Sequence, residues 1–349
     1  MKYGQRFLFI CLVFIAGSFF ISDRHSIAHQ LIGSAVDNTS RSCALVSLVT
    51  TNDNEFIVAS CIVTRRLRVL SPGREIIVFA VNPNDATKEF LTFCGAEVRA
   101  VGNILPENPL LYPLEHPVRR ERFHAGVDTW RSRVQECQNK FWGATLGREF
   151  DAYVWVDSDT LPLKDLSFMC DVKFSGLIAP LYDPSSETLL HVPGFPRVPR
   201  INAGVMAVPH LSANLYQDMV EQMMAWKHTL ALQSSEDDLW EFLQLDQGLI
   251  NYFFRESLWL LPRSFSYHVD TPHHDFMRDT DTGCEIRKEV YVLHYVGSSK
   301  PWYKEVEARP PCSQDFAAWL WWREVENLKH DLRNTTFSIT SFFSSSEAL

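Results

Sequence analysis

Several signatures of common protein classes are missing from this chain of 349 residues. No cluster of lysine and arginine is dense enough to form a nucleic-acid-binding surface, and the formal net charge is −9. The cysteines form neither a Cys-x-x-Cys pair nor a Cys/His cluster, which disfavours a zinc site. The sequence also has no Gly-x-x-x-x-Gly-Lys-[Ser/Thr] loop for a nucleoside triphosphate and no internal repeat. What remains is a globular composition, 46% hydrophobic and 13% aromatic, in one large domain or two modest ones.

The N-terminus carries a secretory targeting pattern. Lys2 and Arg6 precede an apolar run that is long for a cleaved signal core and short for a full membrane span. Because membranes of the early secretory pathway are thin and tolerate short spans, an uncleaved signal-anchor over residues 7–22 is favoured. The basic flank predicts a cytoplasmic tail at 1–6 and a lumenal body, as in a type II membrane protein of the Golgi or ER. Two alternatives to an uncleaved anchor remain: a signal peptide cleaved near Ala16-Gly17-Ser18, or a buried N-terminal helix.

The segments that flank the predicted body fit a lumenal location. Residues 23–42 are polar and aperiodic and predict a stem, and residues 334–349 predict a flexible tail. Asn38 and Asn334 each begin an N-glycosylation sequon near one end of the predicted 43–333 domain. Seven cysteines follow the anchor, so in an oxidising lumen some can pair, and an odd number leaves at least one over. The sequence does not determine which cysteines pair.

Strands and helices alternate through the first part of the body. Strands are predicted over 43–50, 75–81 and 97–101, with helices over 56–67 and 85–93. This alternation predicts an α/β protein with a mostly parallel central sheet and flanking helices. No Gly-x-Gly-x-x-Gly follows the first strand, so a dinucleotide fold gains no support. Further helices are predicted over 127–147, 213–229, 246–254 and 312–330, and the tryptophans of the last favour core packing over a membrane-facing or acceptor-facing patch.

The most informative segment is Tyr153-Val154-Trp155-Val156-Asp157-Ser158-Asp159, in which an apolar strand runs into two carboxylates. Ligands of open α/β sheets lie beyond the carboxyl ends of the strands. Two aspartates there are suited to a divalent cation that holds a diphosphate. A second pair, Asp279 and Asp281, lies in a polar stretch and is interpreted as a solvated loop.

Three later segments add chemistry to this pair. A strand over 200–208 is interrupted at Asn202-Ala203-Gly204, where a ligand can approach the backbone. Asp246 and Gln247 begin a helix and can point into a cleft, although helix capping explains an isolated Asp as well. A strand over 290–293 leads into His294, a candidate imidazole ligand, followed by Gly297 and Lys300 near a tight turn. A structural role for each segment is the alternative.

In this order, the four segments resemble glycosyltransferase family 8, the family of glycogenin, over roughly residues 43–302. The matched motifs are Asp-x-Asp at 157–159, Asn-x-Gly-Val at 202–205, Asp-Gln-Gly-x-x-Asn at 246–251 and His-[Phe/Tyr]-x-Gly-x-x-Lys-Pro-Trp at 294–302. The resemblance implies a GT-A-like nucleotide-diphospho-sugar transferase fold. It also implies a retaining, UDP-sugar-dependent enzyme of hexosyl or N-acetylglucosaminyl type, with Mn²⁺ or alternatively Mg²⁺ as the cofactor.

The resemblance also implies a role for individual residues. The metal ligands would be Asp157, Asp159 and His294, and the reacting face would contain Asp246 and Gln247. The donor would be bound by Thr50, Asn52, Lys140, Asn202, Gly297 and Lys300, of which Thr50 and Asn52 belong to the strand end that receives uracil. The usual uracil-stacking Tyr is replaced here by a stretch that reads Asp53-Asn54-Glu55-Phe56. Leu243 stands where glycogenin-like members have a second acid, which argues against self-glucosylation.

The sequence leaves several alternatives open. The acceptor is a glycan, a lipid or a protein, and oligomerisation is neither required nor excluded. Retention can arise by double displacement through Asp246 or by attack from the leaving-group face, and the resemblance favours the second route. Two other classes share part of the pattern: a nucleotidyl- or phosphotransferase with the same metal–diphosphate geometry, and a catalytically inactive carbohydrate-binding relative. The intact set of Asp157, Asp159, His294 and Lys300 favours the transferase.

Overall fold

The chain divides into two compact units, residues 1–40 and 41–349, and the described residues all belong to the second unit. The computed structural model describes residues 42–50, 53–104, 136–170, 176–182, 199–209, 212–222, 225, 246–270, 276–280, 283–303, 306, 308–333 and 335. The predicted cytoplasmic tail, the predicted signal-anchor, nearly all of the predicted stem and C-terminal tail, and the asparagines of both sequons therefore lie outside this part. Among the described residues, no helix is long and apolar enough to cross a bilayer.

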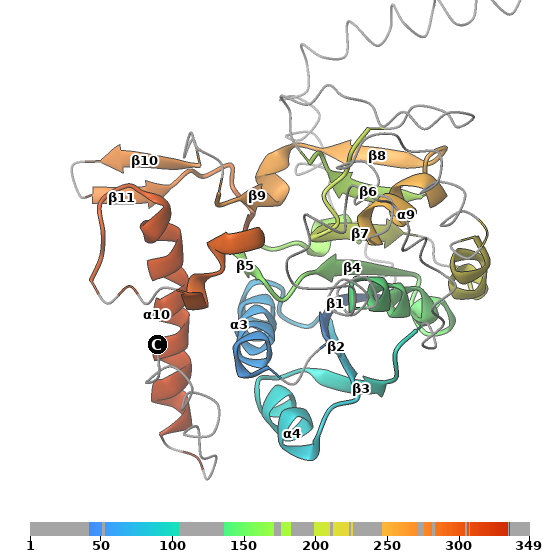
Figure 1. Cartoon of the computed structure of the whole chain (residues 1–349), viewed down its shortest axis with the longest axis horizontal. Helices are drawn as coiled ribbons and strands as arrows, with labels where there is room; N and C mark the ends of the chain where they lie inside the picture. Colours follow the sequence, from blue (N-terminus) through green and yellow to red (C-terminus); the bar gives the residue numbers. More distant parts are fainter. Residues whose placement is uncertain are drawn as a thin grey trace, which may run out of the picture. The chain divides into compact units, whose positions relative to one another are not determined.

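A mixed seven-stranded sheet in the order β3-β2-β1-β4-β7-β6-β8 forms the centre of the second unit (Figure 1). Its strands are β1 (Cys43–Val49), β2 (Glu75–Val81), β3 (Glu97–Val101), β4 (Ala152–Val156), β6 (Leu177–Pro180), β7 (Val205–Pro209) and β8 (Leu258–Leu261). Neighbouring strands are parallel except where β7 pairs with β4 and with β6. The predicted α/β class with a mostly parallel sheet is confirmed.

Helices and two small sheets surround the central sheet. The α-helices are α3 (Asn54–Leu70), α4 (Asp85–Phe93), α9 (Asp246–Phe253) and α10 (Gln314–Leu332). The 3₁₀ helices are η2 (Asn139–Arg148), η3 (Ser167–Met169), η4 (Arg263–Phe265), η5 (Gly297–Ser299) and η6 (Pro301–Tyr303). A three-stranded sheet contains β5 (Thr160–Pro162), β12 (Val292–His294) and β9 (Tyr267–His268), and a hairpin contains β10 (Met277–Thr280) and β11 (Gly283–Ile286).

Both faces of the sheet are buried, which explains why its central strands are apolar throughout. In β1, Leu45 joins a cluster with residues of α3, whereas Val46 joins a cluster with residues of η2 and α9. Successive strand residues point to opposite faces, so a strand between two helical layers needs apolar residues at every position. Every residue of β1 and β4 is accordingly buried.

The structure corrects several element predictions. The predicted 43–50 strand ends at Val49, and the 56–67 helix extends over 54–70. The predicted 200–208 strand begins only at Val205, because the preceding Asn-Ala-Gly forms a turn.

The described part of the predicted 127–147 helix is 3₁₀ helix from 139 onward. Asp279 lies exposed in β10 rather than in a loop, since its segment pairs with β11. Helices predicted over 246–254 and 312–330 are shifted by at most two residues at either end.

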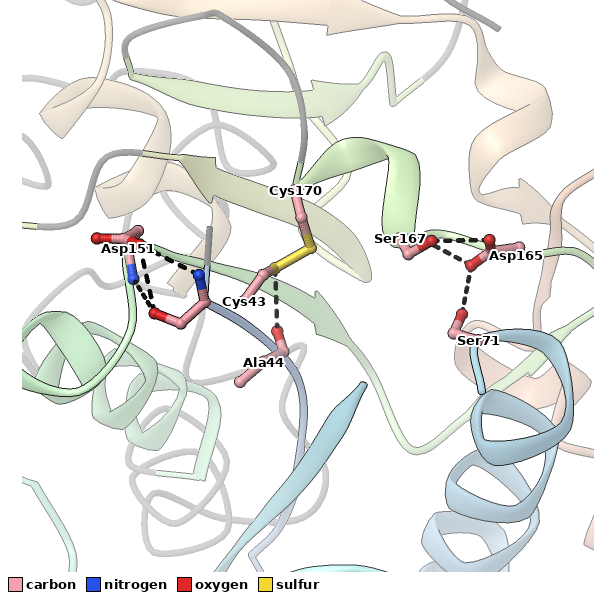
Figure 2. Close-up of a disulfide and its surroundings, with 8 residues drawn as sticks. Cys43, Ala44, Ser71, Asp151, Asp165, Ser167 and Cys170 are labelled. Carbon is pink, nitrogen blue, oxygen red and sulfur yellow. Dashed lines mark hydrogen bonds between the residues drawn. A yellow bond between two sulfur atoms is a disulfide. The ribbon is translucent and has the colours of Figure 1, made fainter. Parts of the chain in front are cut away.

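Three disulfides link distant parts of this unit: Cys43–Cys170, Cys61–Cys94 and Cys284–Cys312. Figure 2 shows the first, which joins the start of β1 to the residue after η3, with Cα atoms 5.9 Å apart. Nearby, Asp165 accepts hydrogen bonds from Ser167 and from Ser71 at the end of α3 (Figure 2). Cys137 is outside the three disulfides, in agreement with the odd number of cysteines that follow the predicted anchor.

The disulfides are expected to stabilise the fold by an amount that grows with the logarithm of the loop length they close. The bonds of Cys43–Cys170 and Cys284–Cys312 close loops with sequence separations of 127 and 28 residues. In the chain-entropy model, replacing Cys43 and Cys170 by Ser should lower the free energy of unfolding by about 5 kcal/mol. Replacing Cys284 and Cys312 by Ser should lower it by about 4 kcal/mol. Denaturant unfolding of the two double variants measures the difference. An equal loss, or a larger loss for Cys284–Cys312, would contradict the loop-length argument.

Candidate metal and sugar-nucleotide site

The site begins where β4 ends. Asp157 follows the last residue of β4, and Asp159 directly precedes β5. The antiparallel pairing of β5 with β12 places His294 opposite Thr160, and the N–H of Tyr295 donates to the Asp159 carbonyl at 2.9 Å. Residues far apart in sequence therefore meet because two short strands pair beside the carboxyl end of a buried parallel strand.

Asp157, Asp159 and His294 form a candidate metal site. Their ligand atoms all lie within 4.8 Å of one another, and His294 Nε2 is 3.3 Å from Asp159 Oδ1. Lys300 also contacts Asp159 and donates to the Tyr295 carbonyl at 2.6 Å. Burial by itself would raise the pKa of Asp159, but His294 and Lys300 outweigh it and hold that pKa well below its ordinary value. The ionised form of Asp159, which a cation ligand requires, is thus favoured.

The Asn202-Ala203-Gly204 turn connects the parts of the site. The carbonyl of Gly204 accepts the N–H of Asp157 at 2.8 Å, because β4 and β7 pair up to that point. The N–H of Ala203 donates to Gln247 Oε1 at 3.0 Å, and the side chain of Asn202 is buried. The interruption of the predicted strand is therefore a buried turn, and its hydrogen bonds connect Gln247 to the start of the Asp-x-Asp segment.

Lys140 is the buried cation of the site. Its Nζ is 2.6 Å from Asp246 Oδ2, 2.9 Å from Asp157 Oδ1 and 3.1 Å from the Ala203 carbonyl. Burial alone would lower the pKa of Lys140, but the charges of Asp157 and Asp246 raise it above its ordinary value. Burial raises the pKa of Asp246 despite the ion pair. Lys140 thus stabilises two carboxylates that would otherwise repel each other.

Removing this buried ammonium should destabilise the fold. In Lys140→Met, Asp157 and Asp246 lose their shared counter-ion, and breaking a buried pair in this way costs about 3–5 kcal/mol. Lys88→Met is the control, since its pair with Asp85 is on the surface and is worth at most about 1 kcal/mol. Chemical denaturation of both variants measures the difference. Equal losses would contradict the account of Lys140.

The remaining predicted residues occupy different parts of the site. Thr50 follows β1 at the carboxyl edge of the sheet, where Asp157 follows the adjacent parallel strand. Gly297 begins η5 with a φ of +55°, a left-handed conformation that favours glycine, and Lys300 directly follows that turn. Asn52 is outside the described residues. Phe56, in the stretch that replaces the expected stacking Tyr, packs against Trp302 with ring centroids 5.1 Å apart.

The structure also reveals residues that the motifs do not contain. The indole N–H of Trp155 donates to Asp157 Oδ1 at 2.6 Å. Ser266 and His268 contact Asn202, and Ser266 also contacts His294. Trp155 belongs to β4, the strand that precedes the Asp-x-Asp, but Ser266 and His268 lie in a segment without a recognisable sequence pattern. Only the parallel pairing of β9 with β12 brings that segment to the site.

Known structures share this fold. A crystal structure of the galactosyltransferase LgtC in complex with donor and acceptor sugar analogues has a TM-score of 0.52 and 18% identity, covering 81% of this chain and 94% of LgtC. An LgtC active-site mutant with a Gln-to-Glu substitution has a TM-score of 0.53 and 16% identity, over 81% and 95% of the two chains. At these identities the likeness establishes the fold alone, which is GT-A-like.

The family comparison points the same way. Residues 140–305 match the family described as glycosyl transferase family 8, and this range contains Lys140, all three candidate metal ligands and Lys300. No curated protein sequence matches the chain. The family match and the GT-A-like fold together support a glycosyltransferase of family 8.

Proposed function

We propose that the protein is a retaining glycosyltransferase that moves a sugar from a UDP-sugar to a glycan, lipid or protein acceptor. The observation that carries this proposal is the convergence of Asp157, Asp159 and His294 within 4.8 Å, beside Lys140 and Lys300. A diphosphate needs such an arrangement, in which a cation site lies next to fixed positive charge. The resemblance favours transfer of a hexosyl or N-acetylglucosaminyl group, and the donor assay below decides which sugar is moved.

The donor set fits Mn²⁺, with Mg²⁺ as the alternative. Two carboxylates and one imidazole leave open positions for phosphate oxygens, and a mixed oxygen and nitrogen set suits Mn²⁺. A bound cation would supply charge neutralisation for the leaving diphosphate. Trp155 and Lys140 hold Asp157 through hydrogen bonds of 2.6 and 3.1 Å, so this ligand is oriented before any cation arrives.

Lys300 is the residue that would bind the diphosphate. Its ammonium contacts Asp159 and its side chain is 12% exposed, so Lys300 lies at the proposed metal site and is partly accessible. The Gly297 turn sets the position of the short segment that carries it. A fixed ammonium beside the leaving group stabilises the negative charge that grows there as the sugar–phosphate bond breaks.

The position of Asp246 supports attack from the leaving-group face. A double displacement needs a carboxylate that is free to attack the anomeric carbon, whereas Asp246 Oδ2 is 2.6 Å from Lys140 in a buried ion pair. Gln247 Oε1 accepts from the Ala203 N–H, which fixes the turn beside the proposed sugar site. We assign Asp246 and Gln247 to the organisation of the sugar pocket, together with Asn202.

Binding of UDP with and without metal tests the donor assignment. Calorimetry on the full chain should show UDP binding that requires Mn²⁺ and disappears with a chelator. Equal UDP binding in the chelator would contradict the metal site. With a donor and an acceptor that support turnover, NMR of the first-formed product should show the anomeric configuration of the donor. Inversion would contradict a retaining reaction.

We further propose that the chain is a single-pass type II membrane glycoprotein of the ER or Golgi, anchored by residues 7–22. The three disulfides support an oxidising compartment, because such bonds are rare in the cytosol. In microsomes, the body should resist added protease, and removal of N-glycans should increase gel mobility. The shift should disappear when Asn38 and Asn334 are both replaced by Gln. Digestion of the body in sealed microsomes would contradict this orientation.

A further inference from the structure

The hydroxyl of Ser266 lies between the candidate metal ligand and the proposed sugar pocket. Ser266 is 2% exposed, and its Oγ is 2.9 Å from Asn202 Oδ1 and 3.1 Å from His294 Nδ1. It directly precedes β9, whose pairing with β12 places His268 opposite His294. This hydroxyl therefore joins two residues of the site by hydrogen bonds at a buried position.

The direction of each hydrogen bond in this network follows from one backbone group. The N–H of Gly204 donates to Asn202 Oδ1 at 2.8 Å, so this atom is the carbonyl oxygen of the amide. A carbonyl oxygen cannot donate, and therefore Ser266 gives its single hydroxyl proton to it. Only lone pairs of Ser266 Oγ remain to face His294, so Nδ1 of His294 carries the proton in that contact.

In the charged ring beside Asp159 both nitrogens carry a proton, but when the ring becomes neutral a proton kept on Nδ1 leaves the other nitrogen free to bind a cation. That nitrogen, Nε2, is 3.3 Å from Asp159 Oδ1 and points into the candidate metal site. Metal-binding histidines are commonly oriented by a partner on their other nitrogen, and loss of the partner weakens metal affinity.

We propose that Ser266 is a positioning residue that holds His294 in the Nδ1–H tautomer, with Nε2 directed at the metal. This inference rests on the proposed metal site and adds a residue to it. The same hydroxyl donates to Asn202, whose Nδ2 contacts His268 Nε2. Ser266 therefore couples the orientation of the metal ligand to that of the sugar-pocket amide.

Mn²⁺ binding to the full chain without donor tests this role. In Ser266→Ala the affinity should fall by about 10–100-fold, whereas Ser266→Thr, which keeps the hydroxyl, should remain near wild type. Ser60→Ala is the matched control, because Ser60 is fully buried in α3 and its hydroxyl has no hydrogen-bond partner among the described residues. Its Mn²⁺ affinity should equal that of wild type.

Two results would overturn the inference. One is wild-type Mn²⁺ affinity in a folded Ser266→Ala variant. The other is an Nε2–H tautomer of His294 in ¹⁵N spectra of the metal-free wild type, assigned by comparison with His294→Asn. The spectra decide the question even if Ser266→Ala fails to fold. Absence of Mn²⁺ binding in wild type is a different result, which would overturn the proposed metal site itself.

Discussion

Replacing Asp159 by Asn should nearly abolish sugar transfer while the chain stays folded. The substitution keeps the shape of the side chain but removes the charge that faces His294 and Lys300. A metal ligand of this kind acts on the charge that develops in the transition state, so turnover should fall by about 10²–10³-fold or more. Initial rates with a saturating donor measure the effect, and circular dichroism checks the fold.

The second Asp-x-Asp provides the control for this variant. Asp279 lies exposed in β10, in a hairpin outside the site. Asp279→Asn should therefore keep wild-type turnover and thermal stability. If both variants kept full activity, Asp159 would have no role in the metal site; equal losses in both would show that the effect is not specific to the β4–β5 junction.

Gly204→Ala should disrupt the site through a single added methyl group. A Cβ at this position would lie 2.5 Å from His294 Nδ1 and 2.9 Å from Asn202 Oδ1, which is closer than real Cβ atoms approach such neighbours. The imidazole must move, and with it the nitrogen that faces Asp159. We expect a loss of turnover of about 10²-fold or more and a stability loss of about 1–3 kcal/mol from overpacking.

Gly102→Ala is the matched control for this substitution. A Cβ on Gly102 has no heavy atom within 4 Å, so the added methyl group meets open space. The control should keep both its melting temperature and its Mn²⁺ affinity, whereas Gly204→Ala should lose Mn²⁺ affinity. Unchanged Mn²⁺ binding in Gly204→Ala would show that His294 is not confined as the structure indicates.

Much of the fold could be predicted because local patterns determine it. The strands over 75–81 and 97–101 and the helix over 85–93 have the predicted bounds, since each is a short segment of distinct local pattern between turn residues. The strand before Asp157 was likewise predictable, because only apolar residues fit between two helical layers. Periodicity failed at Asn202–Gly204, where buried hydrogen bonds rather than a strand hold the backbone.

The candidate site was only partly predictable for a related reason. The motifs identified residues that lie together, among them Asp157, Asp159 and His294, but not the contacts between them. The pairing of Lys140 with Asp246 depends on the packing of η2 against the sheet, which no local pattern encodes. Ser266 carried no signal at all, because its importance arises from the register of β9 with β12.

The most direct test of the proposed function is release of UDP from a panel of donors by the purified full chain. UDP-glucose, UDP-galactose, UDP-N-acetylglucosamine, UDP-xylose and UDP-glucuronate should each be offered with Mn²⁺ or with a chelator. We expect Mn²⁺-dependent release of UDP from one of these donors, and loss of that release in Asp159→Asn. No release from any UDP-sugar with Mn²⁺ present, together with no binding of UDP, would contradict it and favour a non-catalytic carbohydrate-binding protein.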